Sequence, residues 1–175
     1  PFKILTASLC LVASLAAARP ATAEIPEAAY ARVNRALTDG VVIPDYRKLA
    51  EATETFRQAA DRFCRTGGTS DLEPVKKAYH GTMDAWMRVQ PLTFGPVELF
   101  MRNFRLHFWP AGSGRVEKAV VEILADDKPI TADGLRRASV AVQGLAAVEL
   151  LLFGDRADKL RPGTRCCALF TAISG

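Results

Sequence analysis

The stretch Gly144-Leu-Ala-Ala-Val-Glu149-Leu-Leu-Leu-Phe-Gly154 is almost wholly apolar and carries a single ionisable side chain, that of Glu149. Leu and Ala favour a helix, and Gly154 is a suitable C-terminal stop. Apolar residues would lie on every side of this helix, as in an element that other elements surround. Because an isolated buried charge is costly, we expect Glu149 to be paired, protonated or bound to a metal ion. A structural salt bridge or a partly exposed carboxylate is the ordinary outcome of such a pattern, and a ligand site is the alternative.

The beginning of the sequence has the pattern of a secretory signal peptide. Lys3 precedes an uncharged apolar run over residues 4–18, and the small residues Ala21-Thr22-Ala23 follow. This pattern predicts export, with residues 1–23 cleaved and a helical domain in residues 24–175. The apolar run is short for a membrane span, which needs about 20 residues, so no transmembrane segment is expected beyond the signal peptide. A lipoprotein site is not expected, because Leu9 precedes Cys10 where a small residue is needed.

Removing 23 of the 175 residues leaves 152, which is enough for one domain with its own core. The net charge falls from +4 to +2, because Lys3 and Arg19 leave with the signal peptide. So weak a balance gives no reason to expect nucleic acid or an anionic membrane as a partner. The sequence begins with Pro1, and its last apolar pattern runs to the end without a helix cap. We therefore expect the sequence to be part of a longer chain, truncated at its C-terminal end.

Export changes how the cysteines are interpreted. The mature chain keeps Cys64, Cys166 and Cys167, and disulfides form in oxidising compartments. Adjacent residues of a helix point about 100° apart, so only one of the two neighbours can share the distant partner. We expect Cys64 to pair with Cys167, with three free thiols as the alternative. Closing a loop of this length would stabilise the fold by about 4–5 kcal/mol in the chain-entropy description.

Amphipathic patterns divide the mature chain into helices joined by short turns. The strongest pattern begins at Pro44 and ends before Gly67-Gly68; the next helix, capped by Ser70 or Asp71, ends at Pro91. Further helices are expected over residues 28–37, 97–106, 116–125, 131–153 and from 165 onward. No strand pair or repeat is evident. The prediction is an all-α fold, an antiparallel helical bundle.

Few polar side chains are candidates for chemistry. His80, Asp84 and Arg88 lie four residues apart and form one stripe along a helix. His80 and Asp84 could hold a metal ion, but a solvated face is the commoner result of such spacing. We expect His107, near a helix end, to be exposed or to cap that helix. Arg102 and Arg105 could face an anion or Glu98; no GxSxG, HExxH, phosphate loop or paired CxxC motif occurs.

Several separated segments are similar to the imelysin family: Asp84-Ala-Trp-Met-Arg-Val-Gln90, Phe94-Gly-Pro96, Phe108-Trp-Pro110, the stretch from Val140 to Gly154, and Arg165-Cys-Cys-Ala-Leu-Phe-Thr-Ala-Ile173. The resemblance covers roughly residues 30–175 and implies the first helical half of a longer protein with two bundles. Members of this family are bacterial envelope proteins. Some are described as insulin-cleaving metallopeptidases, and others belong to iron-uptake systems.

The resemblance also implies a site, because the signature of the family is GxHxxE. Residues three apart share a helix face, so the imidazole and the carboxylate would converge on one ion. Gly144 and Glu149 match this signature, but Ala146 occupies the histidine position, and a methyl group cannot ligate a metal. Hydrolysis therefore ranks below binding, since a peptidase needs about three protein ligands on its metal.

The expected function is that of a periplasmic, non-proteolytic protein that binds a small ligand or a metal ion, linked to iron or haem uptake. Its cofactor would be iron or another divalent metal, and its partners would be other envelope components of iron uptake. Its site would be a polar cleft where Glu149 lies beside His80 and the face of Asp84 and Arg88. An imelysin-type metallopeptidase is one alternative, and a helical interaction module without a ligand site is another.

Overall fold

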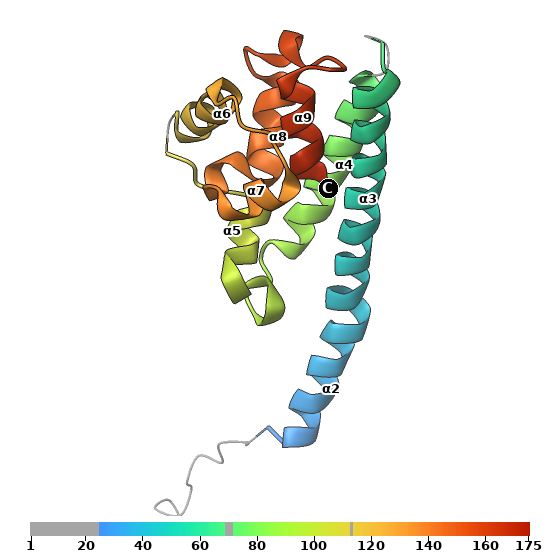
Figure 1. Ribbon diagram of the computed structural model, residues 1–175. Helices are drawn as coiled ribbons and strands as arrows, with labels where there is room; N and C mark the ends of the chain where they lie inside the picture. Colours follow the sequence, from blue (N-terminus) through green and yellow to red (C-terminus); the bar gives the residue numbers. More distant parts are fainter. Residues whose placement is uncertain (1–24, 69–71, 113) are drawn as a thin grey trace, which may run out of the picture. The chain divides into compact units, whose positions relative to one another are not determined.

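The computed structural model describes residues 25–68, 72–112 and 114–175, and the elements of this part are all helical (Figure 1). The predicted signal peptide over residues 1–23 and the predicted caps Ser70 and Asp71 lie outside the described residues. Two units divide the chain after Leu37. In the first unit, helix α2 (Glu27–Leu37) has no buried residue. The all-α prediction is confirmed. In the described residues no helix is long and apolar enough to cross a membrane.

The second unit is built on a pair of long antiparallel helices, α3 (Ile43–Thr66) and α4 (Leu72–Val89), which follow a π-helical turn η1 (Thr38–Val42). Pro44 lies in the first turn of α3, where its missing N–H costs nothing. Thr82 is completely buried between the two helices, and its hydroxyl donates to the carbonyl of Ala52, 3.1 Å away. The helical periodicity of the sequence predicted these two elements correctly. Their buried faces are Leu49, Phe56, Ala60 and Phe63 of α3, with Val75, Tyr79, Thr82, Ala85, Trp86 and Val89 of α4.

Helices α8 (Gly144–Phe153) and α9 (Arg165–Ser174) complete the core against this pair (Figure 1). The ring of Phe170 on α9 meets that of Phe56 edge-on, with their centroids 5.6 Å apart. The Arg165 guanidinium donates to the carbonyls of Ile123 and Leu124, and so ties α9 to the end of α6 (Arg115–Ala125). The short η6 turn (Ala157–Lys159) lies between α8 and α9.

The structure contains the disulfide that the sequence favoured. Cys64 of α3 is bonded to Cys167 of α9, with Cα atoms 5.5 Å apart and a sequence separation of 103. Cys166, the neighbour left over, is a free and buried thiol. The disulfide therefore closes a loop that contains α4 to α8.

Two predicted helices are wrong in extent. The segment 131–153 is not one helix but α7 (Ala132–Arg137), a 3-10 turn η5 (Val140–Val142) and α8. The break is held by the Gln143 amide, which donates to the carbonyls of Leu135 and Ala138 at 2.7 and 2.9 Å. The segment 97–106 is likewise divided, into η3 (Gly95–Val97), η4 (Leu99–Met101) and α5 (Arg102–Leu106). Phe100 and Met101 have positive φ angles there, which a continuous helix cannot contain.

Candidate functional site

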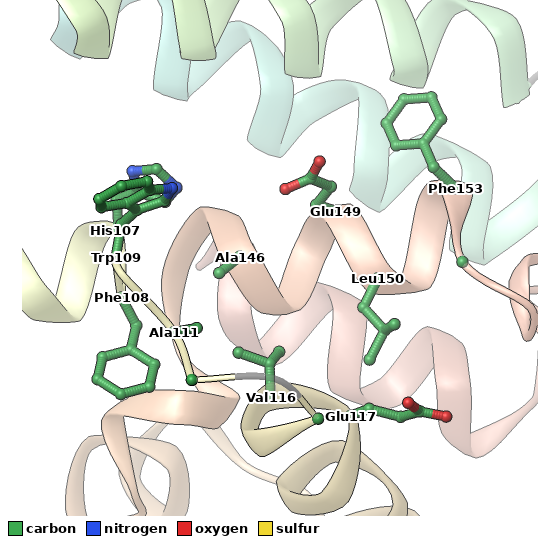
Figure 2. A pocket seen from close by; sticks show the side chains of 13 residues that line it. His107, Phe108, Trp109, Ala111, Val116, Glu117, Ala146, Glu149, Leu150 and Phe153 are labelled. Atoms are coloured by element: carbon green, nitrogen blue, oxygen red, sulfur yellow. The ribbon is translucent and has the colours of Figure 1, made fainter.

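One face of α8 is open, contrary to the expectation that neighbours would surround this helix. Leu145, Ala147, Val148, Leu151 and Leu152 are buried, whereas the side chain of Glu149 is exposed. This open face borders a cavity of about 480 Å³. The carboxylate is therefore neither a buried ion nor a member of an ion pair in the described residues, but a group that points into a cavity (Figure 2).

The walls of the cavity come from three parts of the chain. Helix α8 supplies one wall, the segment after α5 supplies the second, and the beginning of α6 supplies the third. Figure 2 shows the Glu149 carboxylate on the side of the cavity opposite Val116 and Glu117 of α6. The lining residues are His107, Phe108, Trp109, Ala111, Gly112, Gly114, Val116, Glu117, Ala146, Glu149, Leu150, Phe153 and Gly154.

Tyr79 of α4 lies behind Glu149 and is only 3% exposed. Its hydroxyl donates to the Leu145 carbonyl at 3.3 Å. Burial raises the pKa of Tyr79 well above its usual value, and the negative charge of Glu149 raises it further. Tyr79 is thus a neutral hydrogen-bond donor that ties α4 to the first turn of α8, the helix that carries Glu149.

His107 is buried to all but 9% of its surface, contrary to the expectation of an exposed or capping imidazole. The Trp86 indole N–H donates to its Nδ1 over 3.0 Å. Because Nδ1 accepts this hydrogen bond, the imidazole proton of the neutral ring lies on Nε2. Burial lowers the pKa of His107, and the charge of Glu149 opposes that change in part. At neutral pH the cavity therefore contains a neutral imidazole that can donate through Nε2.

We expect acidification to destabilise the protein through His107. Its pKa in the folded state lies below the unfolded value of about 6.5, so the unfolded chain binds more protons in this interval. The contribution of the neutral imidazole is complete above about pH 6.5 and is lost as the pH falls towards the folded pKa. Urea unfolding at a series of pH values should show this loss in the wild type and less of it in His107→Gln.

His80→Gln is the matched control, because His80 is an exposed histidine of α4. This variant should keep the pH dependence of the wild type. An equal slope in the wild type and in His107→Gln between pH 5 and 7 would contradict the assignment.

Gly144 has a structural role that the motif itself does not reveal. Its φ angle is +65°, and a Cβ atom there would lie 2.6 Å from the Leu106 carbonyl carbon and closer still to the carbonyl oxygens of Arg105 and Leu106. The end of α5 therefore crosses the beginning of α8 in direct backbone contact. This close approach brings His107, the next residue, to the same cavity as Glu149.

The other predicted site residues lie elsewhere. Asp84 and Arg88 are exposed on α4, and neither lines the cavity of Glu149. The expected cleft, in which Glu149 would lie beside these two side chains, is therefore not formed. His80 is exposed, with its ring centroid 5.3 Å from that of Phe153, a cavity residue.

Arg102 and Arg105, which could face an anion or Glu98, both donate to backbone carbonyls in the structure. Arg102 donates to the Pro96 carbonyl, and Arg105 donates to those of Phe100 and Arg136. Glu98, the expected alternative partner, accepts a hydrogen bond from the Asn103 amide.

Tyr79, Trp86 and Trp109 also contribute to the site, although no motif of the sequence indicates them. Tyr79 and Trp86 are buried in α4 and act through hydrogen bonds to the Leu145 carbonyl and to His107, whereas Trp109 lines the cavity itself. The only signal available was the density of aromatic residues around His107.

The residues present do not fit a metal site of the zinc type. Glu149 offers a carboxylate on α8 and His107 one free ring nitrogen, Glu117 lies on the α6 wall, and Ala146 offers only a methyl group. Within the residues that the structure describes, no group of three or more His, Cys, Asp or Glu side chains could hold a metal ion. Three protein ligands are the usual minimum for a catalytic zinc ion.

Fold and site together define an all-helical protein with a ligand-sized cavity beside α8, an apolar helix that begins with a glycine. The chain belongs to the imelysin family, whose sequence profile matches residues 42–175. A crystal structure of an imelysin-like protein from Psychrobacter arcticum 273-4 has the same fold, with a TM-score of 0.73 and 22% sequence identity. The match covers 86% of this chain and 47% of that protein, so this chain spans about half the length of its structural relative. No curated relative matches the chain.

Proposed function

We propose that the chain is an exported, non-proteolytic member of the imelysin family that binds its ligand in the cavity at Glu149. The observation that supports this most is the cavity itself, because it lies on the motif helix and combines a free carboxylate with a fixed imidazole. Cavities of this size with a few convergent polar groups are typical ligand sites. Residues 1–23 would direct export, and residues 24–175 would form the binding domain in the periplasm.

The proposed role of the protein is in iron or haem uptake, which is the non-proteolytic role known in the family. Hydrolysis is the weaker candidate, because it needs a metal-activated water held by about three ligands. Glu149, Glu117 and His107 line the cavity but form no group that could hold a metal ion in the described residues, and Ala146 stands at the position where the family signature has histidine.

The first experiment compares the melting temperature of the wild type with that of Glu149→Gln in the presence of ferric, ferrous, zinc and copper ions and of haem. A ligand at a hundred times its Kd stabilises the folded state by about 2.7 kcal/mol. We expect a ligand-dependent rise in the wild type that Glu149→Gln reduces. Glu122→Gln is the control, because Glu122 is an exposed glutamate of α6 that does not line the cavity.

Each other outcome has a clear meaning. Unchanged melting with every ion and with haem counts against an iron-linked role. Proteolysis that is sensitive to chelator and absent in Glu149→Gln would instead favour the metallopeptidase.

A second arm of the experiment restores the missing imidazole. In Ala146→His, the new side chain would share the helix face of Glu149 and face the same cavity as His107. Two imidazoles would then lie beside the Glu149 carboxylate, and we expect zinc to bind about tenfold more tightly or better, the equivalent of about 1.4 kcal/mol or more. Isothermal titration with zinc measures the difference, and equal affinities in the wild type and the variant would contradict the role assigned to Ala146.

A further inference from the structure

The cavity at Glu149 is acidic, although the chain as a whole is basic. Glu117 and Glu149 both line it, and no Lys or Arg does. Neither carboxylate forms an ion pair within the described part of the chain. The one other titratable side chain of the lining is His107, which is neutral at neutral pH because burial lowers its pKa. A ligand in this cavity would therefore meet two carboxylates in the lining, while the cations of Arg115 and Lys76 lie against two of the lining's rings.

Three aromatic side chains, Phe108, Trp109 and Phe153, share the lining with these carboxylates. Two of the rings already attract cations of the chain. The Arg115 guanidinium lies 5.8 Å from the ring centroid of Phe108, and the Lys76 ammonium lies 5.8 Å from that of Phe153. Trp109 is 64% exposed and has no such cation in the described residues. The indole is the best of the aromatic rings for contact with a cation, and this one is available to a ligand.

The polar groups of the cavity favour a ligand that donates hydrogen bonds. Glu149 of α8 and Glu117 of α6 can both accept hydrogen bonds from a ligand, and Figure 2 shows the Glu149 carboxylate on the side of α8 turned away from Glu117. The Nε2 of His107 has no hydrogen-bond partner among the described residues. A bare metal ion finds too few donors here, and an anion would face two carboxylates. A volume of about 480 Å³ admits a group much larger than an ion.

We propose that this cavity binds an organic cation, an ammonium or guanidinium group carried on a small apolar body. The cation would lie against Trp109 and donate to Glu149, with the apolar body against Leu150 and Phe153. The chemistry is the same for a free amine and for a basic side chain of a peptide. This inference rests on the proposed function only in assigning ligand binding to this cavity, and it replaces iron and haem as the class of ligand.

The test is a ligand titration of the full chain. Isothermal titration calorimetry and tryptophan fluorescence both measure the binding. The probes are benzylamine, arginine and N-acetyl-arginine amide, with benzyl alcohol and benzoate as neutral and anionic counterparts of the first. We expect the three cations to bind more tightly than benzyl alcohol, and benzoate to bind more weakly still. Tighter binding of N-acetyl-arginine amide than of arginine indicates a peptide source, and the reverse order indicates a free small molecule.

Two variants test whether Glu149 and Trp109 hold the bound cation. Glu149→Gln and Trp109→Leu should each weaken the binding of benzylamine about tenfold, which corresponds to about 1.4 kcal/mol. Both side chains are exposed, so neither change is expected to unfold the protein. The exposed Glu122→Gln again serves as the control and should bind as the wild type does.

Two results would overturn the inference: benzyl alcohol binding as tightly as benzylamine, or benzylamine binding equally to the wild type and Glu149→Gln. If haem or iron binds at Glu149 while all three cations fail, the ligand class is wrong and the binding function stands. If no cation, metal ion or haem binds, the proposed function fails as well.

Discussion

Gly144→Ala should destabilise the protein more than any other single methyl addition in the described region. A non-glycine residue at φ +65° costs about 1–2 kcal/mol in backbone strain alone. The added Cβ also collides with the carbonyl groups of Arg105 and Leu106, which are backbone atoms and cannot rotate away. We expect a total loss above about 4 kcal/mol in urea unfolding, within the range of severe single substitutions.

The matched control for this variant is Gly81→Ala. Gly81 lies within α4, where a Cβ would find nothing within 4 Å. Alanine favours a helix over glycine by about 0.5–1 kcal/mol, so this change should be neutral or stabilising. Equal stabilities of the two variants would show that α5 does not lie against the start of α8 as the structure has it.

Gly144→Ala has a second expected consequence, for the cavity. If the chain accommodates the methyl group, it must move the end of α5 away from α8, and His107 with it. A variant that still folds should then bind any cavity ligand more weakly than the wild type. The loss of binding in Gly144→Ala can be compared with the loss that Glu149→Gln shows in the melting experiment.

Replacing both Cys64 and Cys167 by serine is expected to have the second largest effect. The disulfide closes a loop of 103 residues, and the chain-entropy description gives about 4–5 kcal/mol for a loop of that length. A domain of this size has a stability of only about 5–15 kcal/mol, so the loss is a large part of the total. The melting temperature should fall by about 10–20 °C.

Two controls accompany the double variant. Adding a reductant should lower the stability of the wild type by a similar amount and leave the double variant unchanged. Cys166→Ala removes the free thiol and keeps the disulfide, so it should cost only about 1 kcal/mol as a small change in a packed core. If the reductant has no effect on the wild type, the bond does not form in solution.

Local sequence patterns predicted the elements whose apolar residues repeat without interruption. Helices α3, α4, α6 and α9 lie within one or two residues of their predicted bounds, because their turn and cap residues are read from neighbours in the sequence. The continuous helix over 131–153 was wrong, since the apolar pattern crosses a break that only the Gln143 amide and the positive φ of Gly144 create.

For the candidate site, too, the sequence predicted what lies within one helix and not what comes from another segment. Glu149 was identified as the unusual residue of its helix, and the absence of the motif histidine at Ala146 was evident from the sequence. Its proposed neighbours Asp84 and Arg88 were chosen from helical spacing, which describes one helix at a time. The residues that share the cavity come from another segment, around His107, and no local pattern relates the two.

The sequence by itself determined the class of fold, the main helices, the favoured cysteine pair and the importance of residue 149, because periodicity, composition and motif letters are local properties. Only the tertiary structure decided that the face of α8 around Glu149 is open and that Trp86 fixes the tautomer of His107. It also decided that the backbone of α5 crosses Gly144. These features depend on contacts between residues far apart in the chain, such as Trp86 and His107 with a sequence separation of 21, and packing rather than local preference sets them.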